Sequence, residues 1–141
     1  MGYELGFLNN DLKKEIGTID SNLNNISKYT VIGDLEEAIV EMQTKHPEAK
    51  LCYVQMFLMD DETIDIITKD ENKKPEIKKR RKEFYEQIEI LCKKRNVAYI
   101  DVTDKFVGTG TKYRQDDGIH LKESGYQLIM PYILEELEKI I

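Results

Sequence analysis

The chain has 141 residues, of which 40% are hydrophobic and 34% are charged, and its formal net charge is −6. This composition is typical of a soluble globular protein, and no apolar run approaches the ~18 residues that a membrane span requires, so a disordered chain and a membrane-spanning chain are both excluded. The negative charge also argues against general affinity for nucleic acid, which needs a basic surface to neutralise phosphates.

The first 28 residues are rich in Gly and Asn and show no sustained period, which predicts a long loop. They contain no basic segment leading into an apolar stretch, so no secretory signal is predicted and a cytoplasmic location is the default expectation. From Asp34 onward, apolar residues recur at i, i+3, i+4 and i+7, which predicts an amphipathic helix over about 34–45 with Asp34 as its N-cap. His46, beside Pro47, is expected to cap the carboxyl end of this helix. The apolar stripe consists of Leu35, Ala38, Ile39 and Met42.

Two apolar segments are predicted to be strands. The run 51–58 is apolar apart from Gln55, and its length and β-favouring content predict a strand buried on both faces. An acidic loop is expected over 60–65. The segment 97–102 is predicted to be a second buried strand.

Two further helices are predicted. Residues 76–95 carry an apolar stripe and end in cations, which suit the carboxyl end of a helix dipole. The basic run 78–82 lies in this helix beside acidic residues and is expected to be a solvated face. Residues 103–121 contain three glycines and are expected to form a loop, and residues 123–140 return to a helical period.

The order of helix, buried strand, helix, buried strand and helix predicts an α/β fold with a parallel sheet, in a single domain over residues 1–141. Two strands alone leave such a sheet poorly covered, with an exposed edge. We therefore expect further chain or a partner subunit to complete it, and we expect the isolated chain to form homo-oligomers. The two cysteines, Cys52 and Cys92, have no zinc-ligand spacing and are expected to be small buried apolar residues.

An acid and a base stand close together in the last predicted loop. Asp117 precedes His120 by three residues, in a Gly-containing segment just ahead of a helix. Such spacing can place a carboxylate beside an imidazole. A hydrolase uses this pair because histidine takes a proton from a hydroxyl nucleophile, while the acid fixes its tautomer and stabilises the imidazolium.

The segment Asp117-Gly118-Ile119-His120-Leu121, followed by Gly125-Tyr126, resembles the last block of SGNH/GDSL-type hydrolases, written D-G-x-H-L-x-x-x-G-Y. The resemblance in organisation extends over about residues 30–141. It implies a three-layer α/β/α, flavodoxin-like fold with a mostly parallel sheet. It also implies hydrolysis of small acyl esters or acetylated carbohydrates by Ser/Asp/His chemistry, without a metal or cofactor. In that chemistry, His120 would be the general base and Asp117 the orienting acid.

Two other parts of the family pattern are poorly matched. The G-x-N-D block, whose Asn helps to form the oxyanion hole, is met either by Gly6 to Asp11 with extra residues after the Gly, which selects Asn10, or by Gly2 to Leu5, where Glu4 could not donate. A turn role for Asn10 remains an alternative. The Gly-Asp-Ser nucleophile block is absent, because none of the serines follows a Gly-Asp pair. The chain is therefore either truncated relative to the family or has lost the chemistry, and weak esterase activity is expected in both cases.

Two other kinds of function remain open. One is a catalytically inactive α/β module that binds a partner through the uncovered edge of its sheet. The other is a phosphoacceptor or magnesium site at the acidic residues that follow the first predicted strand, where α/β proteins often bind ligands. The residues of this acidic group are Asp60, Asp61, Glu62 and Asp65.

Overall fold

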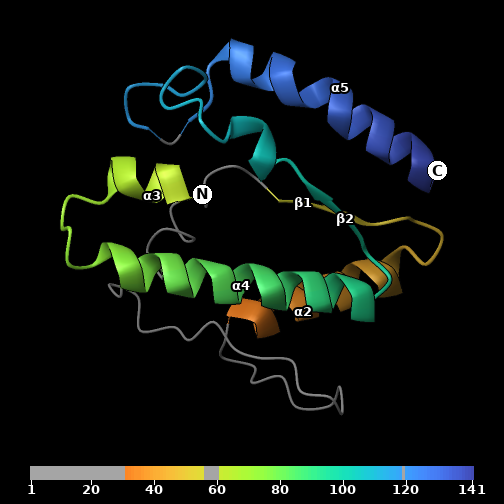
Figure 1. Cartoon of the computed structure of the whole chain (residues 1–141). Helices are drawn as coiled ribbons and strands as arrows, with labels where there is room; N and C mark the ends of the chain where they lie inside the picture. Colours follow the sequence, from red (N-terminus) through yellow and green to blue (C-terminus); the bar gives the residue numbers. More distant parts are fainter. Residues whose placement is uncertain (1–30, 56–60, 119) are drawn as a thin grey trace. The chain divides into compact units, whose positions relative to one another are not determined.

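The computed structural model describes residues 31–55, 61–118 and 120–141 (Figure 1). The elements follow one another as α2 (Val31–Lys45), β1 (Cys52–Gln55), α3 (Asp61–Ile67), α4 (Lys74–Lys94), β2 (Ala98–Asp101), the 3-10 helix η2 (Thr103–Phe106) and α5 (Glu123–Ile140). The chain forms two compact units. Among the described residues, unit 1 comprises 31–51 and 75–97, and unit 2 comprises 52–55, 61–74, 98–118 and 120–141.

Helix α2 of unit 1 begins ahead of the predicted start, at Val31. Asp34 therefore lies in its first helical turn, where a carboxylate suits the positive end of the dipole, and the prediction that Asp34 is the N-cap is wrong. The buried stripe is also shifted: it includes Ile32, Glu36 and Ile39, whereas Met42 is 43% exposed. The expected apolar stripe missed Glu36 because a carboxylate does not contribute to hydrophobic periodicity.

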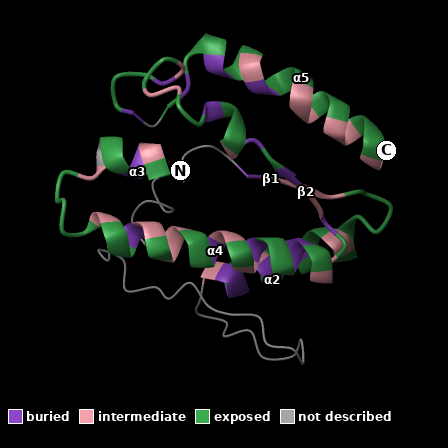
Figure 2. Cartoon of the chain, viewed as in Figure 1, coloured by how far each residue is buried: buried purple, intermediate pink, exposed green. Residues whose placement is uncertain are grey.

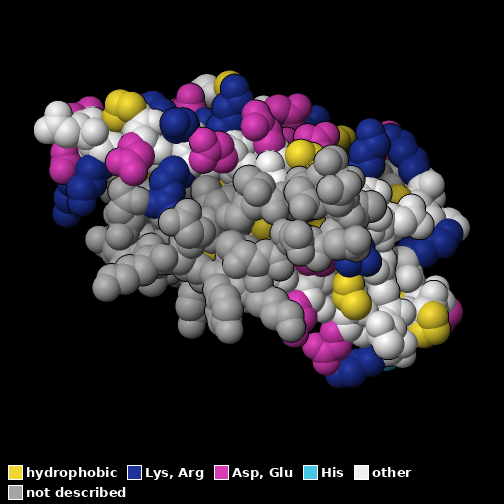
Figure 3. Space-filling model, turned by 90° about the horizontal axis from the view of Figure 1, so that it is seen from below, with side chains coloured by type: hydrophobic (Ala, Val, Ile, Leu, Met, Phe, Trp, Pro, Cys, Tyr) yellow, Lys and Arg dark blue, Asp and Glu magenta, His cyan; other side chains and the backbone are white. Residues whose placement is uncertain are grey.

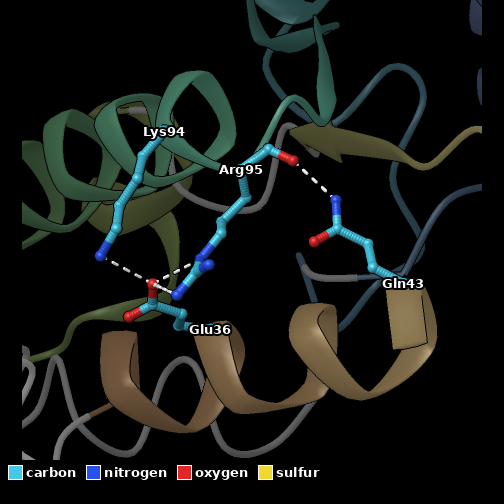
Figure 4. A network of polar contacts seen from close by, with 4 residues as sticks. All are labelled: Glu36, Gln43, Lys94 and Arg95. Carbon is cyan, nitrogen blue, oxygen red and sulfur yellow. Dashed lines mark hydrogen bonds and ion pairs between the residues drawn. The ribbon is translucent and has the colours of Figure 1, made fainter. Parts of the chain in front are cut away.

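Glu36 is the centre of an ion cluster in unit 1, formed with Lys94 and Arg95 at the end of α4 (Figure 4). Its Oε1 lies 2.8 Å from Lys94 Nζ and accepts a hydrogen bond of 2.6 Å from Arg95 Nε. Only 9% of the Glu36 side chain and 7% of the Lys94 side chain are exposed. The Gln43 side chain adds a 2.6 Å bond to the Arg95 carbonyl. These contacts tie α2 to the end of α4, and we call Glu36, Lys94 and Arg95 the Glu36 cluster.

Helix α4 confirms the predicted apolar stripe, since its buried residues are Ile77, Phe84, Ile88, Leu91 and Cys92. Within the basic run 78–82, Lys79 and Lys82 are exposed and the other three residues are half-buried. Arg81 lies over the Tyr85 ring, 5.8 Å from its centroid. On the described surface that Figure 3 shows, cationic and anionic side chains are intermixed. The run is thus partly solvated and partly packed on its own helix.

The sheet belongs to unit 2. Strands β1 and β2 pair in parallel, with Cys52 opposite Ala98 and Gln55 opposite Asp101. Parallel strands need a long crossover connection, and here the chain between them runs through α3 and α4. This arrangement confirms an α/β fold with a small parallel sheet.

Strand β1 is less buried than its apolar run predicted. Cys52, Tyr53 and Val54 are half-buried, and the polar Gln55 is 2% exposed. The expectation that Cys52 is buried is therefore wrong. In the described part of the chain the sheet has two strands. Tyr53 and Tyr99, opposite each other in the register, stack with ring centroids 6.1 Å apart. Residues 56–58 of the predicted strand lie outside the described residues.

The acidic segment after β1 is a helix, α3, which corrects the prediction of a loop over 60–65. Thr63 and Ile64 are fully buried, and Asp61 and Glu62 occupy the first turn, where carboxylates are favoured. The loop prediction for 103–121 missed η2, whose Phe106 is fully buried.

Helix α5 matches its predicted bounds and contacts β2. Lys105, in η2, lies 4.5 Å from the centroid of the Tyr132 ring on α5. The buried residues of α5 are Gly125 and Ile129, and most of the helix is exposed or half-buried (Figure 2). Across the described ranges, no helix combines the length and apolar character needed to cross a membrane.

Candidate active site

The loop after η2 ends in a short hairpin that carries the predicted acid and base. Arg114 and Leu121 form an antiparallel bridge, and the Gln115 backbone N–H donates to the His120 carbonyl over 2.7 Å. Gly118 turns the chain with φ of 74° and donates its N–H to the Gln115 carbonyl over 2.9 Å. A left-handed residue is readily supplied by glycine, which has no Cβ. We call residues 114–118 together with His120 and Leu121 the site hairpin.

Within the site hairpin, the Asp117 carboxylate contacts His120 twice. Oδ1 accepts the His120 backbone N–H over 2.9 Å, and Oδ2 lies 2.5 Å from the imidazole Nδ1. An ionised carboxylate only accepts hydrogen bonds, so Nδ1 is the donor of this pair. In the neutral imidazole, Nε2 then keeps its lone pair, which is the state a general base needs.

The pair is open to solvent. The exposed fractions of the His120 and Asp117 side chains are 52% and 43%. Beside them is an open depression of about 500 Å³, whose lining includes Gln115, Asp116, Asp117 and Lys122. A substrate can therefore reach the acid and base from solvent without a change in the described residues.

The site hairpin is fastened to the start of α5. Lys122 N–H donates to the Tyr113 carbonyl over 2.8 Å, and Gln115 Nε2 donates to the Leu121 carbonyl over 3.0 Å. Gly125 allows a close approach: a Cβ there would lie 2.8 Å from Leu121 Cδ2 and 2.9 Å from the Tyr113 carbonyl oxygen. Since Leu121 is 3% exposed, the Leu and Gly of the motif are packing residues that set the hairpin against the helix.

The other predicted site residues are not brought to this hairpin. Asn10 lies outside the described residues, so its proposed place in an oxyanion hole stays a prediction. Ser124 is exposed in the first turn of α5. His46 directly follows α2, and its backbone N–H donates to the Met42 carbonyl over 2.9 Å, as a residue at a helix end does.

The acidic group does not form a recognisable metal site in the described part of the chain, where no three His, Cys, Asp or Glu residues come together as potential ligands. Asp60 lies outside the described residues. Glu62 instead accepts the Gly110 backbone N–H at Oε1 over 2.7 Å. Sequence reasoning missed this contact because its partners are 48 residues apart.

The α/β chain thus carries a solvent-accessible Asp–His pair ahead of α5, an acid–base pair of the kind that hydrolases use. The family model described as the GDSL-like Lipase/Acylhydrolase family matches residues 9–128. This range covers most of the chain, which therefore belongs to the GDSL-like lipase/acylhydrolase family. No curated protein and no solved structure gave a match.

Proposed function

We propose that this protein hydrolyses esters through Ser/Asp/His chemistry, with His120 as the general base and Asp117 as its orienting acid. The observation that carries the proposal is the 2.5 Å contact between Asp117 Oδ2 and His120 Nδ1, in a chain of the GDSL-like family. The open, polar depression beside the pair supports small acyl esters or acetylated carbohydrates as substrates. We also propose that the fold has the three-layer α/β/α arrangement.

In the proposed reaction, His120 Nε2 accepts the proton of a serine hydroxyl while its oxygen attacks the ester carbonyl. Asp117 stabilises the resulting imidazolium. The imidazolium then protonates the leaving alkoxide, and water hydrolyses the acyl-enzyme by the same transfers in reverse. Asn10 is the proposed donor to the oxyanion. No metal or cofactor takes part in these steps.

The nucleophile of this reaction is proposed to lie outside the described residues. Ser124 is the one serine within them; it is exposed and does not follow a Gly-Asp pair. We expect slow turnover by the 141-residue chain, because none of its serines follows a Gly-Asp pair.

Hydrolysis of p-nitrophenyl acetate by the full chain tests this assignment. The variants are His120→Ala and Asp117→Asn, and His46→Ala is the matched control, since the chain has two histidines. We expect weak turnover that falls in the two site variants and is unchanged in the control. Equal turnover in wild type and His120→Ala would refute the role of His120. Robust turnover abolished by His120→Ala would instead refute the proposal about the nucleophile.

We also propose that the chain associates with a second copy of itself. Exposed apolar side chains follow one another at i, i+4 and i+8 on α5: Tyr126 is 47%, Met130 is 43% and Leu134 is 54% exposed. Covering such side chains is favourable by ~1.5 to 3 kcal/mol each. Sedimentation at micromolar concentration should give a dimer that Leu134→Glu dissociates. A monomer whose unfolding is independent of concentration would exclude association, and with it an inactive module that acts by self-association.

A further inference from the structure

Gly110, in the loop that leads from η2 to the site hairpin, is held on both sides by ionisable side chains. Its N–H donates to Glu62 Oε1 over 2.7 Å, and its carbonyl accepts a 2.7 Å hydrogen bond from Arg114 Nη1. Its φ of 55° lies in the left-handed region, so the direction of both peptide groups depends on a conformation that most other residues avoid. One peptide position thus joins α3 to the first residue of the site hairpin.

Arg114 is 1% exposed and is the largest of the fully buried side chains among the described residues. Arginine is rarely buried to this extent unless its charge and donors are matched, because desolvating a guanidinium is unfavourable. Hydrophobic side chains of similar volume often serve stability equally well at such positions. A buried arginine that donates to a loop carbonyl therefore indicates that the position of the loop backbone has to be fixed, in addition to the filling of space.

The backbone of Arg114 leads directly to the acid and base. Arg114 forms the bridge with Leu121, its neighbour Gln115 donates to the His120 carbonyl, and the His120 N–H donates to Asp117. His120 is therefore held at its carbonyl by the residue next to Arg114 and at its N–H by its own acid partner. A movement of Arg114 is therefore expected to displace Gln115, whose N–H holds the His120 carbonyl.

We propose that Glu62 and Arg114 are positioning residues, which clamp Gly110 and thereby hold the site hairpin so that Asp117 meets His120 Nδ1. This inference deepens the proposed function and rests on it for its catalytic meaning. Neither residue touches the reacting atoms. Their effect is to keep His120 in the tautomer with the proton on Nδ1.

Nitrogen NMR of the histidine rings in the full chain tests the clamp without requiring turnover. At pH 9, where an ordinary histidine is neutral, the Nδ1 and Nε2 shifts report the tautomer. Arg114→Met and Glu62→Ala remove the two clamping groups. Arg114→Lys keeps a donor, and Glu62→Gln keeps an oxygen acceptor. Lys112→Met is the matched control, since it removes an exposed cation from the same loop.

We expect Arg114→Met and Glu62→Ala to shift His120 toward a mixture of tautomers and to speed hydrogen exchange of its amide by about fivefold. Arg114→Lys and Glu62→Gln should restore most of the wild-type spectrum. Lys112→Met should leave the His120 signals in place, and every variant should leave those of His46 unchanged.

Lower unfolding stability with unchanged His120 ring shifts in either variant would show that the side chain is merely structural and would overturn the proposal. If Arg114→Met does not fold, Glu62→Ala, at a half-buried position, gives the same test. The failures of the two proposals are distinguishable. If the His120 ring shifts respond to Arg114→Met and Glu62→Ala but turnover is the same in His120→Ala as in wild type, only the proposed function is refuted. If turnover depends on His120 but the ring shifts respond to neither clamp variant, only the clamp is refuted.

Discussion

Replacing Gly125 with alanine is expected to destabilise the protein, although alanine is the better helix former. Alanine is favoured over glycine by ~1 kcal/mol in a helix interior and by less in the first turn, where Gly125 lies. The new Cβ, however, would lie 2.8 Å from Leu121 Cδ2 and 2.9 Å from the Tyr113 carbonyl oxygen. The Leu121 side chain can turn, but the Tyr113 carbonyl is backbone and already accepts the Lys122 N–H over 2.8 Å.

Overpacking of this kind typically costs about 1 to 3 kcal/mol, which exceeds the gain in helix propensity. We therefore expect a net loss of up to about 2 kcal/mol in the free energy of unfolding for Gly125→Ala. Because Leu121 adjoins His120, the contact with Asp117 should also loosen. Urea unfolding followed by circular dichroism measures the first effect, and the His120 ring shifts measure the second.

Ser124→Ala is the matched control, because it adds no atom and changes the exposed neighbour of Gly125 in the same helical turn. Its unfolding free energy should stay within about 0.5 kcal/mol of wild type. A Gly125→Ala protein as stable as Ser124→Ala, or more so, would refute the argument that the close approach requires glycine. The same control tests the nucleophile, since any turnover should survive the loss of the Ser124 hydroxyl.

Two further outcomes follow from burial. Glu36→Ala should lower the unfolding free energy by about 3 kcal/mol in urea titrations, because it removes the carboxylate beside the buried Lys94. Glu37 is exposed, so Glu37→Ala should change the unfolding free energy little. Equal effects of the two substitutions would contradict this argument. Partial burial of the half-buried Cys52 raises the pKa of its thiol, so less of it is thiolate at a given pH. Its alkylation at pH 8 should be slower than that of glutathione and should rise with pH. Cys92, 1% exposed, should stay unmodified until the protein unfolds, and rapid labelling of either cysteine in the native protein would count against these assignments.

The sequence alone predicted the elements whose periods are long and regular. Helix α4 buries the expected stripe and α5 has the expected bounds, because a run of five or six turns averages out exceptions. Short elements were predicted less well. The acidic segment that became α3 has seven residues, too few for a period to emerge, and its charged first turn resembles a loop. Its helical form depends on the burial of Thr63 and Ile64, which the local sequence does not reveal.

The Asp117–His120 contact was within reach of the sequence because three residues and a glycine turn separate the partners, so local backbone geometry suffices to join them. The sequence could not predict the partners of Glu62 and Glu36. Glu62 contacts Gly110, 48 residues away, and Glu36 contacts Arg95, 59 residues away. The contact between the acid and the base thus depends on residues that lie close together in the sequence. The support that holds them is decided by tertiary packing, because only the folded chain brings a buried charge and its distant partner into one low-dielectric environment.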